Sequence, residues 1–339
     1  MRRIVRHIRQ VGAQLLYSSG LLELIAQHRL AGRCAVLTYH RVLDESRARL
    51  ANSNPGIVVS DKIFEMHMRT LRDRFNPVSL SQFQSWLDDQ VSLPPQSCLV
   101  TFDDGWLDNF EVAYPILKKY DIPACIFLPV RYISSADMFW QEEILMRLAA
   151  MASDTGGETA AQLKSLIGIP DDERVVSTDD LQQFVTNLKS LSYVELDKVI
   201  HNIRTATASY ANVSHYNRYL SWEHVAEMKA SGIEFASHGV SHRILSKLAA
   251  SQCREELIQS RAELRDHLGE PVSAIAYPNG GFSKDVIDEA RKAGFSTGFT
   301  TRPGHATPQT DPLLVPRINI HSGNSDSEAR FIGTCARVI

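Results

Sequence analysis

The chain has 339 residues, of which 44% are hydrophobic, so it can bury one large α/β domain or two ordinary ones and is not a disordered protein. Its formal net charge of −3 gives no electrostatic case for a nucleic-acid partner, which would require a basic excess. The five cysteines form no CxxC pair, and no apolar run approaches the roughly 20 residues that span a bilayer. The N-terminus also lacks a convincing signal peptide, so we expect a cytoplasmic protein.

The first 33 residues carry six arginines and a single acidic residue, Glu23. Apolar residues at near-helical spacing between the arginines predict a basic amphipathic helix. Such a helix either docks on an anionic membrane or packs on the domain with a solvated basic side, and composition alone favours packing. Residues 1–33 are therefore expected to form a helical extension, with peripheral attachment to the inner membrane face as the alternative.

From residue 34 onward, apolar strand-like runs alternate with helical segments. The expected strands cover residues 34–39, 99–102, 124–128, 233–236, 273–277, 296–300 and 313–320. The expected helices cover residues 60–75, 81–89, 106–119, 221–231, 251–268 and 284–293, with Pro115 interrupting the third of them. Strand, helix and strand with short joints form a βαβ unit, which implies a parallel sheet.

This alternation stops between about residues 133 and 220. Residues 140–151 and 181–203 have helical patterns, and the segments between them are rich in glycine, serine and aspartate. The region is too long for a structureless loop in a compact domain, so we expect a helical insertion.

Polar residues follow four of the predicted strands. They are His40 and Arg41, Asp103 and Asp104, His238 and His242, and His321. The carboxyl ends of parallel strands meet on one face, so these side chains can converge. Two imidazoles four residues apart and one carboxylate make a three-ligand site with open positions, which suits catalytic Zn²⁺. Each signal alone is weak, because an HxxxH pattern arises by chance and a carboxylate pair can form a turn or hold Mg²⁺.

The sequence TFDDG at residues 101–105, followed by HGVSH at residues 238–242, resembles the polysaccharide deacetylases of carbohydrate esterase family 4, the NodB-homology group. The resemblance extends over residues 34 to 321, apart from the helical insertion. It implies an irregular (β/α) barrel of about seven strands, with residues 34–339 as the catalytic domain. It also implies metal-dependent hydrolysis of an N-acetyl group on an amino sugar.

Carried over to this sequence, the resemblance makes Asp103 the general base. It makes Asp104, His238 and His242 the ligands of a divalent metal, expected to be Zn²⁺. This division is chemically reasonable, because the ion neutralises one carboxylate while the other stays free to take a proton.

The other family motifs are less well matched. The family's Arg-x-Pro-Tyr-Gly segment aligns with residues 276–280, where Ala276 replaces the arginine that orients the base. Arg317, at the end of another strand, is the candidate replacement. The backbone N–H of Asn279 is the expected oxyanion donor, and His321, in a degenerate Leu-x-His motif, is the expected general acid.

Three further residues near strand ends are candidates for substrate contacts: His40, Tyr277 and Trp106. The expected substrate is an N-acetylated sugar, either in a polysaccharide or in a lipid-linked or nucleotide-linked precursor, and the expected lack of export favours a precursor. Deformylase or O-acetyl esterase activity on a sugar uses the same site and stays open. A catalytically silent carbohydrate-binding protein is the third alternative, because the family arginine is absent from its usual place.

Overall fold

The computed structural model describes residues 12–44, 46–48, 53–154, 156–170, 175–210 and 217–338. The chain divides into two compact units. A barrel unit contains residues 1–44, 55–135 and 219–339, and a helical unit contains residues 45–54 and 136–218. Within the described ranges, no helix has the length and apolar character needed to cross a membrane.

Seven parallel strands close into a barrel in the order β1-β10-β9-β8-β7-β6-β5, and β1 also pairs with β5 to complete the ring. The strands are β1 (Cys34–Tyr39), β5 (Ser97–Phe102), β6 (Ala124–Leu128), β7 (Glu234–Ser237), β8 (Ala274–Ala276), β9 (Thr297–Pro303) and β10 (Val315–Asn319). A short strand, β4 (Asn76–Pro77), pairs with β5 outside the ring, and β2 (Arg41–Leu43) pairs with β3 (Val58–Ser60). The predicted barrel of about seven strands is confirmed.

Both faces of the barrel strands are covered, which explains their nearly continuous apolar sequences. Every residue of β1 and of β5 is buried. Their register pairs Cys34 with Ser97 and continues to Tyr39 with Phe102. The residues that follow these two strands, His40 and Asp103, therefore emerge side by side at the carboxyl-terminal edge of the barrel.

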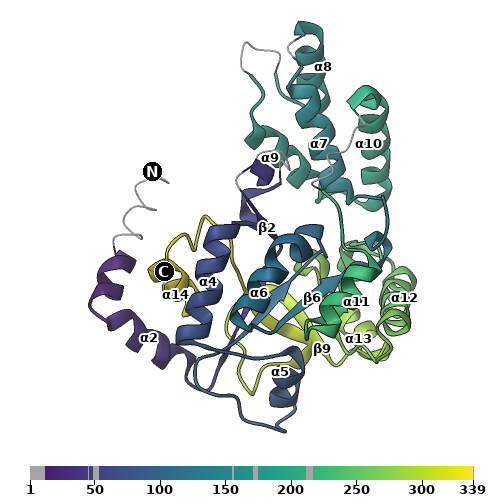
Figure 1. Cartoon of the computed structure of the whole chain (residues 1–339). Helices are drawn as coiled ribbons and strands as arrows, with labels where there is room; N and C mark the ends of the chain where they lie inside the picture. The colour runs from purple at the N-terminus through teal and green to yellow at the C-terminus, as the bar shows by residue number, and fades with distance from the viewer. Residues whose placement is uncertain are drawn as a thin grey trace. The chain divides into compact units, whose positions relative to one another are not determined.

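Helices cover the outside of the strands (Figure 1). They are α4 (Asp61–Arg74), α5 (Leu80–Leu87), α6 (Tyr114–Tyr120), α11 (Trp222–Ala230), α12 (Ala250–Leu268), α13 (Lys284–Lys292) and α14 (Glu328–Cys335). Ser60 caps α4 by accepting the N–H of Ile63 at 3.3 Å. The predicted interruption at Pro115 is present: a π-helical turn at Asn109–Ala113 precedes α6, and the proline lies in the first turn of α6, where its missing N–H costs nothing.

The N-terminal extension is described from residue 12, so four of its arginines lie outside the described residues. Residues 12–18 are helical, and Gly20, with φ of 74°, forms the turn into α2 (Leu21–Leu30). The helix α2 buries Leu22, Ala26 and Leu30 and packs against α14. The described part of the extension therefore packs on the barrel unit.

The helical unit contains α7 (Trp140–Ala152), α8 (Gly157–Ile167), α9 (Thr178–Leu188) and α10 (Tyr193–Ala206), whose apolar faces form a core of their own. The prediction of one helix over residues 181–203 is wrong. Ser192 accepts the N–H of Glu195, whose carboxylate in turn accepts the N–H of Ser192, and this capping box starts a new helix at Tyr193. The helix α8 begins at Gly157, within a segment whose glycine-rich and serine-rich composition favours a loop.

Candidate active site

Asp103 lies directly after β5 and is 3% exposed. Arg317 of β10, 2% exposed, forms two parallel bonds to it: Nη1 donates to Oδ1 and Nη2 to Oδ2, each at 2.7 Å. Burial raises the pKa of Asp103, but the Arg317 guanidinium, together with His238 and His40, outweighs burial and holds the pKa below its ordinary value. The contact predicted between these two residues is present, and it keeps the carboxylate ionised and oriented.

Asp104 turns the chain sharply away from Asp103. Its φ is 77° and that of Gly105 is 65°, so two successive residues adopt the left-handed conformation. A Cβ on Gly105 would lie 2.8 Å from Cδ2 of Leu128, which restricts this position to glycine. The DDG sequence therefore directs the two carboxylates to different neighbours.

The Oδ1 atom of Asp104 faces two imidazoles, with Nε2 of His242 at 3.2 Å and Nε2 of His238 at 3.5 Å. One ligand atom from each of these three residues lies within 4.8 Å of the others. Burial raises the pKa of Asp104, but the two histidines outweigh burial and hold the pKa well below its ordinary value. The three residues predicted as metal ligands are thus brought together.

The chemistry of this donor set fits a divalent cation. Nδ1 of His238 lies 2.7 Å from the carbonyl oxygen of Ala276, which can only accept, so Nδ1 carries a proton. When the ring is neutral, its Nε2 therefore presents a lone pair. Oδ1 of Asp104 is buried, and among the described residues it has no hydrogen-bond donor other than the two histidine Nε2 atoms that face it. Lone pairs that converge in a buried site are stabilised by a positive ion, and imidazole nitrogen with carboxylate oxygen suits Zn²⁺.

Glu256 of α12 binds the loop that carries both histidines. Its carboxylate accepts the N–H groups of Val240 at 2.8 Å and of Ser241 at 3.0 Å, as well as the Ser241 hydroxyl. Gly239, with φ of 78°, supplies the turn after His238. Glu256 was not singled out from the sequence, where it is one of several acidic residues in an amphipathic helix.

His40 lies beside the candidate base, with its Nε2 4.0 Å from Oδ2 of Asp103. Burial lowers its pKa, which favours the neutral ring. Its Nδ1 is buried and has no hydrogen-bond partner among the described residues. The predicted substrate contact of His40 stays a prediction, and its position is compatible with that role.

His321 follows β10, and its Nδ1 accepts the N–H of Gly323 at 3.1 Å. The proton of the neutral ring is therefore on Nε2, the tautomer that a donor at Nε2 requires. Oδ1 of Asn324 accepts the backbone N–H of His321 at 3.0 Å. The role of His321 as general acid stays a prediction.

The turn at residues 278–280 is formed as the sequence indicated. Asn279 has φ of 54°, and a Cβ on Gly280 would lie 2.0 Å from Oγ1 of Thr301. The role of the Asn279 N–H as oxyanion donor stays a prediction.

Two predicted substrate contacts need correction. Trp106 and Tyr277 are both fully buried, so neither ring offers a face to a sugar. The Tyr277 hydroxyl donates to the carbonyl of Leu313 at 3.1 Å, inside the barrel unit. The indole of Trp106 donates to Oδ2 of Asp104 at 3.1 Å. Large aromatic residues near strand ends are core residues here.

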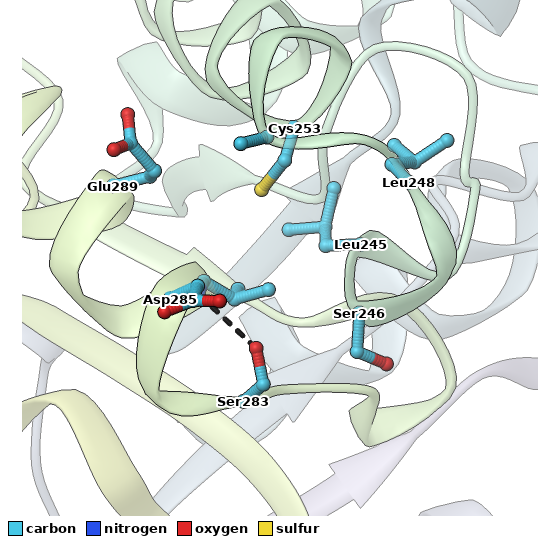
Figure 2. A pocket seen from close by; sticks show the side chains of 9 residues that line it. Leu245, Ser246, Leu248, Cys253, Ser283, Asp285 and Glu289 are labelled. Atoms are coloured by element: carbon cyan, nitrogen blue, oxygen red, sulfur yellow. Dashed lines mark hydrogen bonds between the residues drawn. The ribbon is translucent and has the colours of Figure 1, made fainter.

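A small pocket of about 90 Å³ lies between η5 (Leu245–Lys247), α12 and α13 (Figure 2). Its lining includes Cys253, Ser283 and Glu289. Ser283 caps α13, Arg254 and Lys292 bind Glu289, and burial raises the pKa of Cys253 to about 11. These contacts stabilise α12 and α13. None of the residues that line the pocket belongs to the group of Asp104, His238 and His242, which we call the Asp104 cluster.

The closed parallel barrel, with a carboxylate pair and two imidazoles at its carboxyl-terminal edge, is a (β/α) barrel with a candidate cation centre. The chain belongs to the polysaccharide deacetylase family, whose model matches residues 90–161 and 179–298.

Individual proteins that are similar to the chain are also named as deacetylases. The Bacillus subtilis protein YxkH, also assigned to the polysaccharide deacetylases, is 24% identical over 293 residues, covering 86% of this chain and 73% of that protein. The poly-beta-1,6-N-acetyl-D-glucosamine N-deacetylase of Staphylococcus epidermidis is 23% identical over 290 residues, covering 83% of this chain and 77% of that protein. The structure of the Streptococcus pyogenes deacetylase PplD in complex with acetate has the same fold, with a TM-score of 0.59 and 20% identity over 90% of this chain and 99% of that one.

Proposed function

We propose that this protein is a metal-dependent N-deacetylase that hydrolyses the N-acetyl group of an amino sugar in a glycan or glycan precursor. The observation that carries the proposal is the pairing of Asp103 with Arg317 next to the Asp104 cluster, on the barrel of a polysaccharide deacetylase. One carboxylate is held ionised by an arginine, while its neighbour is turned toward two histidines.

Asp104, His238 and His242 would hold the cation, for which the donor set favours Zn²⁺. When bound, such an ion supplies a Lewis acid for the amide carbonyl and lowers the pKa of a water molecule.

The other steps belong to side chains of this protein. Asp103 accepts the proton of the attacking water, because its low pKa keeps it ionised at neutral pH. The Asn279 N–H donates to the developing oxyanion. Nε2–H of His321 protonates the leaving amine, and His40 contacts the substrate.

The substrate class is proposed from the relatives and from the N-terminal extension. The S. epidermidis relative is named for poly-β-1,6-N-acetyl-D-glucosamine, so β-linked N-acetylglucosamine is the first sugar to test. Leu15, Leu21 and Leu24 are 67%, 45% and 62% exposed in a segment with six arginines. This combination suits the anionic surface of a membrane, and a peripheral cytoplasmic enzyme could reach a lipid-linked precursor there.

The test is acetate release by the metal-loaded protein from oligomers of β-1,6-N-acetylglucosamine, other N-acetylated oligosaccharides, and lipid-linked and nucleotide-linked N-acetyl sugars. We expect release from at least one class and none from the Asp103→Asn variant. Matched N-formyl and O-acetyl sugars distinguish the deformylase and esterase alternatives. Binding of these sugars without release of any acyl group would favour a silent carbohydrate-binding protein.

Membrane contact is tested by co-sedimentation of the full chain with vesicles. We expect binding to vesicles that contain anionic phospholipid and loss of binding when Leu21 and Leu24 are both changed to Ser. Equal recovery in the supernatant with anionic and neutral vesicles would overturn the membrane contact and leave the deacetylase proposal unaffected.

A further inference from the structure

The two carboxylate oxygens of Asp104 have different surroundings. Oδ2 accepts the indole Nε1–H of Trp106 at 3.1 Å, whereas Oδ1 faces His238 and His242 and has no other donor among the described residues. A carboxylate with one oxygen tied to a fixed donor presents the other as a single ligand atom in one direction.

The indole ring is itself restrained by two contacts. The guanidinium carbon of Arg41 lies 4.2 Å from the ring centroid, and the ring of Tyr219 stacks on the indole at 4.7 Å. The backbones of Trp106 and Tyr219 also form an antiparallel bridge, and the N–H of Leu220 donates to the carbonyl of Gly105 at 2.8 Å. The position of the indole is therefore set by segments distant in sequence.

Arg41 is fixed in turn by Asp108. Nε of Arg41 donates to Oδ2 of Asp108 at 3.0 Å, and Oδ1 accepts the N–H of Val42 at 2.8 Å. Arg41 is fully buried and Asp108 is 4% exposed. A buried ion pair contributes little net stability, because desolvation offsets the attraction, so its place against the indole indicates a positioning function.

We propose that Trp106 is a positioning residue for the metal ligand Asp104, and that the buried pair of Arg41 and Asp108 holds the indole in place. The indole N–H occupies Oδ2 and leaves Oδ1 for the cation. This inference rests on the metal-binding part of the proposed function. It assigns Trp106 a role in cation affinity instead of the sugar stacking that its position in the sequence had suggested.

The test compares Zn²⁺ affinity in competition with a chromophoric chelator. Trp106→Phe keeps one aromatic ring for Arg41 and Tyr219 but removes the N–H donor together with the second ring of the indole. We expect its affinity to fall about 10-fold to 100-fold, the usual effect of losing a hydrogen bond to a metal ligand. The matched control is Trp86→Phe in α5, where the indole is 7% exposed and packs on Phe83, and we expect wild-type affinity there.

Circular dichroism and thermal unfolding without metal show whether each variant is folded. If Trp106→Phe is not, benzothienylalanine at position 106 provides a ring of nearly the same shape without the N–H. If a folded variant that lacks the N–H keeps the wild-type affinity for Zn²⁺, the inference about Trp106 is overturned and the proposed function is not affected. Failure of the wild-type protein to bind Zn²⁺, Co²⁺ or Mn²⁺ overturns the inference and the metal-dependent function together, so the two failures are distinguishable.

Discussion

Arg317 and Asp103 form a bidentate ion pair across the carboxyl-terminal edge of the barrel, with both N–O distances at 2.7 Å. The guanidinium is held from its other side, because its Nε donates to the carbonyl of Thr300 at 2.9 Å. Ala276 stands where the sequence alignment placed the family arginine. The charge that orients the base is thus supplied from β10.

Replacement of Arg317 by Gln should move the acid limb of the kcat/KM profile to higher pH. Asp103 must be ionised to act as a base, and its pKa is lowered by Arg317 against the opposing effect of burial. Without the guanidinium, the effect of burial is opposed less strongly, so the pKa of Asp103 rises and activity is lost at a higher pH than in the wild type. Arg317→Lys keeps a charge but not two parallel bonds, so it should lower kcat with a smaller shift. An unchanged acid limb in folded Arg317→Gln would contradict this role.

Removal of the metal with a chelator should abolish acetate release and lower the melting temperature. A ligand that binds only the folded state stabilises it by about 2.7 kcal/mol at a concentration of 100 Kd. Adding Zn²⁺ to the metal-free wild type should therefore raise the melting temperature. Asp104→Asn, in which asparagine tolerates the positive φ, is the control and should show a much smaller rise.

His321→Ala should reduce kcat by about 10²-fold to 10⁴-fold, the usual contribution of a general acid. Zn²⁺ affinity should stay at the wild-type value, because the proposed ligands are elsewhere. Activity and affinity are measured on the same preparation. A kcat close to that of the wild type would remove His321 from the mechanism.

His67 should make the protein less stable in acid. The ring is fully buried, its Nε2 donates to the carbonyl of Ser325 at 2.7 Å, and burial lowers its pKa to about 3. Between the ordinary pKa of 6.5 and about 3, the unfolded chain binds a proton that the folded chain does not. The free energy of unfolding therefore falls as pH falls, by up to about 1.4 kcal/mol per pH unit.

His67→Gln keeps a donor and an acceptor but cannot titrate. Urea unfolding at pH 7, 6, 5 and 4 should show a shallower loss of stability in this variant than in the wild type. Parallel stability curves for the two proteins would rule out His67 as the source of the acid sensitivity.

The strands and the converging site were predictable, because buried β-branched runs and polar residues at strand ends are local signals. The strands β1 and β6 have the bounds that the sequence indicated. The break between α9 and α10 was missed because apolar spacing continued across Ser192, whose capping box decides the boundary. The helix α14 was missed as well, since only tertiary packing buries it.

The burial of Trp106 could not be predicted for a different reason. Its partners Arg41 and Tyr219 are distant in sequence, and a tryptophan after a DDG turn is compatible with either a sugar or a core contact. The contact of Asp108 with buried Arg41 could not be predicted either, because the two residues are 67 positions apart. Arg317 could be predicted, because a missing arginine required a replacement at another strand end.

The most direct test of the division of roles between the two adjacent carboxylates is a joint measurement of metal content and acetate release in Asp103→Asn and Asp104→Asn. Asp103→Asn should bind one equivalent of metal and release no acetate above background, because it loses the base but keeps the ligands. Asp104→Asn should bind metal at least about 10-fold more weakly than the wild type, because a neutral amide replaces the anionic ligand. Substantial acetate release by Asp103→Asn, or wild-type metal affinity in Asp104→Asn, would contradict the assignment.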